Sequence, residues 1–133
     1  MKQTLPALCA SLLLAAGLFS TPVLADSPVE LDMQAMAKAF KAASHADDAA
    51  QLQASLEQLK AAATHAKGEV PEKFKDEAAD GPNRQAYQQG LDQLIGQVDQ
   101  ALGLLKDGKL DEAKALLEEI NSTKRTYHKK LDA

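Results

Sequence analysis

Apolar side chains recur every three or four residues in four separate stretches of the chain. This interval places them on one face of an α-helix, so each stretch predicts an amphipathic helix. In residues 29–45 the repeating positions are Val29, Met33, Met36, Phe40 and Ala43. In the second stretch they are Leu52, Leu56, Leu59, Ala63 and Ala66. Asp47 or Asp48 is a suitable N-cap for this second helix, and Gly68 and Pro71 end it.

A polar connection containing Phe74 and a Gly81-Pro82 break leads to the other two stretches. In residues 82–106 the apolar positions are Tyr87, Leu91, Leu94, Ile95, Val98, Leu102 and Leu105. Asp107-Gly108 predicts a tight turn before residues 109–131, whose inward positions are Leu110, Ala113, Leu117, Ile120, Lys124, Tyr127 or His128, and Leu131. Two of the three connections are very short, which forces neighbouring helices to run antiparallel. The pattern predicts an all-α fold, an antiparallel up-down-up-down four-helix bundle.

Three glycines interrupt the third stretch, at Gly90, Gly96 and Gly103. Each costs about 1 kcal/mol relative to Ala in a helix. Closer approach of a neighbouring helix is a gain that would offset this cost.

Residues 1–25 have a different pattern from the rest of the chain. Lys2 precedes an apolar run, and Pro22 and small residues up to Ala25 follow it. This order is typical of a secretory signal peptide, and the apolar run is too short to span a bilayer. We expect cleavage after Ala25, which removes the only cysteine, Cys9, and leaves residues 26–133 as one domain. The expected location is the periplasm of a Gram-negative bacterium, or the outside of another cell.

Composition and charge agree with a helical protein that does not bind nucleic acid. Hydrophobic residues make up 45% of the chain and aromatic residues only 4%, with no Trp, a balance that favours helices over sheets. The net charge is −4, and it becomes −5 once Lys2 is removed. No basic tract is interleaved with aromatic residues, as nucleic-acid binding would require. No feature indicates an oligomer, so we expect a monomer.

The sequence contains none of the motifs that would indicate an enzyme. It has no H-E-x-x-H zinc signature, no C-x-x-C and no glycine-rich phosphate loop. A di-iron bundle needs Glu-x-x-His, but the residues three before the histidines are Ala42, Ala62 and Arg125. His45 fits a helix-end dipole partner, and His65 is expected to be solvated. We therefore do not expect an enzyme.

One end of the predicted bundle brings together two soft ligands. Met33 lies about one turn into the first helix, and His128 lies about one turn from the end of the last, which is its neighbour. The same end receives Tyr87 and Leu91, together with small alanines of the second helix that leave unusual room. A thioether and an imidazole suit haem iron with two axial ligands. Spacing alone leaves open that Met33 fills the core and that His128 is a dipole partner.

Several short segments, taken in their order and mutual spacing, are characteristic of one family. They are Asp47-Asp48-Ala49-Ala50-Gln51, Leu59-Lys60-Ala61-Ala62-Ala63, Gly90-Leu91-Asp92, Ile95-Gly96-Gln97-Val98-Asp99 and Thr123-Lys124-Arg125-Thr126-Tyr127-His128. Through them the chain from residue 26 onward resembles the soluble cytochrome b562 family over essentially its whole length. The resemblance implies a non-covalently bound haem b, held by a Met of the first helix and a His of the last. The matching positions here are Met33 and His128. Met36 matches an apolar family position that is not a ligand.

The chain departs from the family pattern around the expected haem. Tyr87 and Leu91 stand where other members have a pair of Phe, and a buried Tyr87 needs a partner for its hydroxyl. Lys124 stands where an Arg near a haem propionate would be expected, and it lacks the bidentate fork of Arg. Without a cysteine after cleavage, the thioether attachment of a c-type cytochrome is excluded.

The resemblance implies a one-electron carrier, because Met and His would fill both axial positions of the iron. Its acidic surface is expected to steer it towards a basic face of an unidentified redox partner protein. One alternative is a cofactor-free periplasmic helical protein with a binding or chaperone-like role. Another is a copper- or iron-sequestering protein, which would need further soft ligands, and only Met36 is available. Peroxidase-like catalysis ranks third, because Met and His would leave no open coordination position on the iron for a substrate.

Overall fold

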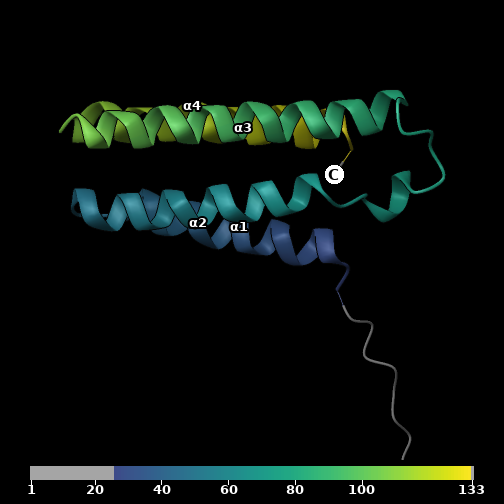
Figure 1. Cartoon of the computed structure of the whole chain (residues 1–133), viewed down its shortest axis with the longest axis horizontal. Coiled ribbons are helices and arrows are strands. Elements are labelled where there is room, and N and C mark those ends of the chain that lie inside the picture. Colours follow the sequence, from purple (N-terminus) through teal and green to yellow (C-terminus); the bar gives the residue numbers. More distant parts are fainter. Residues whose placement is uncertain (1–25, 133) are drawn as a thin grey trace, which may run out of the picture.

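The computed structural model describes residues 26–132, which form four long helices and one short 3₁₀ helix. The helices are α1 (Pro28–Ser44), α2 (Ala49–Lys67), η1 (Glu72–Phe74), α3 (Pro82–Lys106) and α4 (Leu110–Lys130). Figure 1 shows the long helices running along one axis, with α1 and α2 in one layer and α3 and α4 in the other. This arrangement confirms the predicted all-α up-down-up-down bundle. The predicted signal peptide lies outside the described residues, and its cleavage stays a prediction.

The helix ends follow from local capping chemistry. The Ser27 hydroxyl accepts a hydrogen bond from the Glu30 N–H at 3.3 Å, and the Glu30 carboxylate accepts one from the Ser27 N–H at 2.8 Å. This reciprocal pair fixes the start of α1. Asp48, rather than Asp47, caps α2 by accepting the Gln51 N–H at 2.8 Å. The turn between α3 and α4 contains Gly108 at φ 75°, a conformation that glycine adopts without strain.

The core lies between the two layers and is built from aliphatic side chains of every long helix. All five apolar positions predicted for α2 are buried, and Leu52, Leu56 and Leu59 are among the largest fully enclosed side chains. In α4 the prediction of the inward face was partly wrong. Lys124 is exposed, and Leu116 and Thr123 are buried although the predicted set omitted them. Thr123 faces α3, where the Gln93 side-chain amide donates a hydrogen bond to its hydroxyl at 3.4 Å.

The four helices do not pack equally closely. Consecutive helices contact each other along much of their length, whereas α1 and α4 touch only sparsely. The start of α1, the end of α2, the start of α3 and the end of α4 meet at one end of the bundle (Figure 1). A cavity can therefore open between the first and last helices at that end. Within the described residues, no helix is long and apolar enough to cross a membrane.

Candidate functional site

A largely apolar cavity of about 210 Å³ opens at the end of the bundle where α1 begins and α4 ends. It is lined by Met33, Met36, Ala37, Phe40, Leu59, Tyr87, Gly90, Leu91, Leu94, Ile120, Thr123, Lys124, Tyr127, His128 and Leu131. All four long helices contribute, and α1, α3 and α4 supply most of the wall. The five residues singled out from the sequence, Met33, Tyr87, Leu91, Lys124 and His128, all belong to this wall.

The two candidate ligands come from α1 and α4, which contact each other far less than consecutive helices do. Met33 lies half-buried on α1, and His128 lies exposed on α4. A second thioether, that of Met36, lines the same cavity and is only 7% exposed. The cavity therefore offers one imidazole and two sulfur atoms in otherwise apolar surroundings. Among residues 26–132 there is no group of three or more His, Cys, Asp or Glu side chains able to hold a metal ion.

Tyr87 finds the hydrogen-bond partner that its burial requires. Its hydroxyl donates to the Ala66 carbonyl at 2.7 Å, and the residue is 5% exposed. Ala66 lies in the last turn of α2, where carbonyls have no partner within the helix. Burial raises the pKa of Tyr87 to about 12, so the phenol stays neutral at physiological pH. The polar tip of Tyr87 is thus satisfied by α2, and its ring adds to the cavity wall.

Gly90 allows the Tyr127 ring to lie directly against the α3 backbone. A Cβ atom at residue 90 would be 2.7 Å from both Cγ and Cδ1 of Tyr127, well inside van der Waals contact. Gly96 and Gly103 have nothing within 4 Å of such an atom. The expected close approach of helices is therefore found at Gly90 alone among these three. Since Tyr127 precedes His128, this contact also fixes the α4 turn that carries the candidate ligand.

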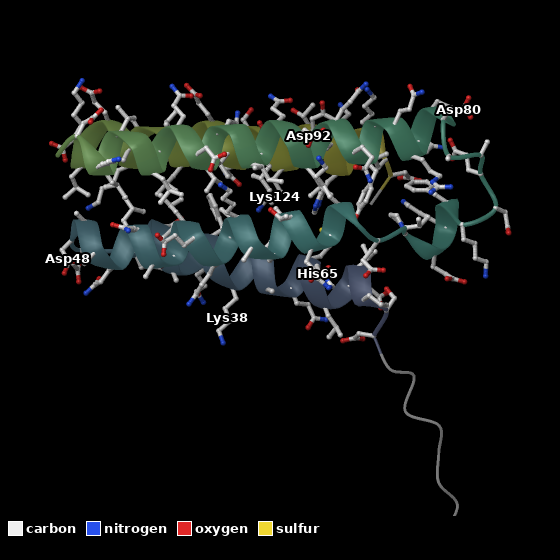
Figure 2. All side chains as sticks on the ribbon, viewed as in Figure 1. Lys38, Asp48, His65, Asp80, Asp92 and Lys124 are labelled. Atoms are coloured by element: carbon white, nitrogen blue, oxygen red, sulfur yellow. The ribbon has the colours of Figure 1, made fainter. Side chains whose placement is uncertain are left out.

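Lys124 lies between the two layers of the bundle, as Figure 2 shows. Its Nζ is 5.5 Å from the centre of the Phe40 ring, within the range of a cation–π contact. The lysine thus brings a positive charge to the rim of an apolar cavity, joining α4 to α1. Sequence reasoning missed the contribution of Phe40 to this wall, although its place in the α1 apolar repeat was a usable signal.

His65 is exposed, as expected, and it is also paired with a side chain of another helix. Its Nδ1 lies 2.7 Å from Oδ2 of Asp32, which is mostly buried. The hydrogen bond to Asp32 and the charge of that carboxylate raise the pKa of His65. The pair joins α2 to α1 next to Met33. Figure 2 places His65 at the cavity end of the molecule. The sequence does not indicate this contact, because the two residues lie on different helices.

Comparison with known proteins points to one family. A profile of the cytochrome b562 family matches residues 28–132, which are all of the described residues except the first two. A protein of Yersinia pestis named "Probable soluble cytochrome b562 2" is 37% identical over 130 residues, covering 98% of each chain. A second Yersinia pestis protein, "Probable soluble cytochrome b562 1", is 29% identical over 116 residues, covering 85% of this chain and 91% of its own. These matches confirm the resemblance drawn from the sequence, and this chain belongs to the cytochrome b562 family.

Proposed function

We propose that the protein is a one-electron carrier whose non-covalently bound haem b is ligated by Met33 and His128. The observation that carries the proposal is the meeting of these two side chains, from the first and last helices, at one apolar cavity. Membership of the cytochrome b562 family supports the electron-carrier role.

The residues around the cavity fit a haem group. A porphyrin ring is flat and apolar, and the wall offers Phe40, Tyr87 and Leu91 as contact surfaces. The acidic propionates need a cation at the rim, where Lys124 lies. The two soft donors match a known axial ligand pair of haem iron. The Tyr87 hydroxyl already donates a hydrogen bond to the Ala66 carbonyl, so it would need no partner from the porphyrin.

Held by Met33 and His128, a haem would supply reversible exchange of one electron between Fe(III) and Fe(II). The thioether of Met33 would stabilise the Fe(II) state relative to a second imidazole and so raise the reduction potential. The bundle holds Met33 and His128 on helices anchored by the α2 and α3 core. This anchoring keeps the two ligands in place when the charge of the iron changes.

We also propose that the protein acts as a monomer in the periplasm. The proposed location rests on the signal-peptide pattern of residues 1–25. There the carrier would exchange electrons with a partner protein.

Copper binding is the second candidate function, because Met36 lines the same cavity as Met33 and His128. Two thioethers and an imidazole form a donor set that Cu(I) accepts. This candidate predicts that Met36 is as important for binding as Met33. Haem ligation by Met33 and His128 predicts instead that Met36 is less important for binding than Met33.

The deciding experiment is a haemin titration of residues 26–133, followed in the visible spectrum before and after reduction with dithionite. We expect saturation at one haem per chain and sharp low-spin bands in the reduced form. Met33→Ala and His128→Ala should each abolish the low-spin spectrum. Met36→Leu and His45→Gln are the matched controls and should retain it.

Two outcomes would overturn the proposal. One is a broad spectrum that does not saturate and is indifferent to Met33→Ala and His128→Ala. The other is stoichiometric Cu(I) binding that Met36→Leu abolishes, with no saturable haem binding. The first would favour a cofactor-free bundle and the second a copper-binding protein.

A further inference from the structure

The last two turns of α4 are strongly basic, although the chain as a whole is acidic. Between residues 124 and 131 there are four Lys or Arg side chains, one His and no Asp or Glu. The four cationic residues are Lys124, Arg125, Lys129 and Lys130, and all are exposed. The net charge of the whole chain is −4. This stretch of α4, which supplies part of the cavity wall, therefore has the opposite sign to the molecule.

Most of this charge is not neutralised by ion pairs. Lys60, Lys67 and Lys75 are paired with Asp99, Asp92 and Glu72 respectively. Within the described residues, Lys129 and Lys130 form no ion pair. Arg125 lies 3.3 Å from Glu118, but both side chains are more than 60% exposed, so water screens the pair.

Stabilisation of the helix dipole explains only part of the cluster. A cation near a helix C-terminus is favourable, but the effect falls off within the last turn. That turn accounts for Lys129 and Lys130, whereas Arg125 lies a turn earlier. The Lys73 amine adds a further positive charge here by donating to the carbonyls of Leu131 at 2.5 Å and Asp132 at 2.9 Å.

We propose that Arg125, Lys129 and Lys130 form a docking surface for an acidic face of the redox partner protein, a proposal that rests on the electron-carrier function above. The same segment carries Lys124 and His128 into the cavity wall, so a partner on this surface would lie beside the proposed haem. This surface, rather than the acidic average charge, sets the sign of the docking interaction. Net charge alone predicts a basic partner face, whereas at this surface we expect an acidic one.

The physical reason is the range of electrostatic forces in salt solution. At physiological ionic strength the Debye length is about 8 Å, so charges farther away are largely screened. A partner approaching the end of α4 therefore responds to the nearby basic side chains more than to acidic side chains at the far end of the bundle. Complementary charge mainly accelerates association and fixes orientation.

The test uses two small oxidants of opposite charge with the haem-loaded, reduced protein. Ferricyanide, an anion, and tris(phenanthroline)cobalt(III), a cation, each take one electron from the Fe(II) protein. Rates are measured by stopped flow from about 10 mM to about 0.2 M salt. We expect the ferricyanide rate to fall as salt rises, which is the sign for attraction, despite the negative net charge of the protein. Polyglutamate, a mimic of an acidic protein face, should slow the ferricyanide reaction by occupying the surface.

The test variant is Arg125→Gln/Lys129→Gln/Lys130→Gln, which leaves Lys124 and His128 unchanged. We expect the ferricyanide rate at low salt to fall by about tenfold and its salt dependence to flatten or reverse. Inhibition by polyglutamate should disappear. The matched control is Lys38→Gln/Lys106→Gln/Lys109→Gln, which changes the net charge equally at exposed positions outside α4's last two turns. It should alter the ferricyanide rate less than twofold.

The outcomes separate the docking surface from the proposed function. If both triple variants slow the reaction with ferricyanide equally, or if the wild-type rate rises with salt, the proposed docking surface is wrong. The proposed electron-carrier function would be unaffected by either result. If the wild-type protein binds no haem, or its haem exchanges electrons with neither oxidant, the proposed function fails and the docking surface with it. The visible spectrum and haem affinity of each variant confirm that the cavity is intact.

Discussion

Tyr127 packs so closely on Gly90 at the cavity wall that a single added methyl group would disturb the contact. The sequence indicates that three glycines weaken α3, but it does not distinguish them, because each sits in a similar helical pattern. Distances across the bundle make the distinction: of the three, only Gly90 is a position where an added Cβ atom would lie 2.7 Å from an aromatic ring. The same limit applies to Tyr87. Its need for a hydrogen-bond partner follows from the sequence, but its partner, the Ala66 carbonyl, depends on where α2 ends.

We expect Gly90→Ala to destabilise the protein and the two other glycine substitutions to stabilise it. Overpacking against Tyr127 costs about 1–3 kcal/mol. Replacing glycine by alanine gains about 1 kcal/mol in helix propensity, so the cost exceeds the gain over most of its range. Gly96→Ala and Gly103→Ala meet open space and should each raise the free energy of unfolding by about 0.5–1 kcal/mol. Urea denaturation of the three variants measures the difference. Equal stabilisation by all three substitutions would contradict the close contact at Gly90.

At the scale of helices, the ends and inner faces follow largely from the sequence. The predicted limits of α3 match the structure, because Pro82 starts the helix and the Asp107-Gly108 turn ends it. The links between helices do not follow from the sequence. Lys73 on η1 reaches the carbonyls of the two residues that follow α4, and His65 on α2 reaches Asp32 on α1. Both links join residues far apart along the chain, so no local pattern records them.

The ion pair between α1 and α2 predicts a pH-dependent stability. The pKa of His65 is raised in the folded protein, so its stabilisation is fully present below the unfolded pKa of about 6.5. It is lost as pH rises through the folded-state pKa. We expect the free energy of unfolding to fall over this window by more in the wild type than in Asp32→Asn or His65→Gln. Urea denaturation of the haem-free protein from about pH 5 to about pH 9 tests this. Parallel pH profiles in all three proteins would rule out the pair as the cause.

The contact between η1 and α4 predicts unequal effects of two neighbouring lysines. Lys73→Ala leaves the carbonyls of Leu131 and Asp132, directly after α4, without this donor and should lower the free energy of unfolding by about 1 kcal/mol. Lys75 is exposed and paired only with Glu72 in the same short element, so Lys75→Ala should change stability by less than about 0.5 kcal/mol. Hydrogen exchange of the last α4 turn gives a second measurement, which should be faster in Lys73→Ala alone. Identical exchange in the two variants would show that Lys73 does not secure α4.

For the whole molecule, the bundle and five residues of the cavity wall were predictable from the sequence. The unequal packing of the four helices was not. Antiparallel topology places Met33 and His128 at one end, and the structure brings all five singled-out residues to one cavity. Periodicity contains no information about the distance between α1 and α4. It therefore could not indicate that these two helices touch so sparsely. That opening is a property of three-dimensional packing, and it creates the room for a cofactor.

Because α1 and α4 contact each other so little, haem should stabilise the protein strongly. A ligand that binds only the folded state raises stability by about 2.7 kcal/mol at a free concentration one hundred times its Kd. We expect the midpoint of thermal unfolding to rise with haem concentration in the wild type and in Met36→Leu. It should rise much less in Met33→Ala and in His128→Ala. Calorimetry at several haem concentrations measures this, and a midpoint independent of haem in the wild type would contradict it.

The cavity between the first and last helices has a consequence for the order of events during biosynthesis. Met33 on α1 is made before His128 on α4, so the full cavity wall cannot form until α4 has been synthesised. A nascent or truncated chain that lacks the end of α4 has one proposed ligand and no enclosed wall. Under the proposed ligation, uptake of haem therefore follows the synthesis of α4, and the absorbance of the bound cofactor marks molecules in which all four helices have been made and folded.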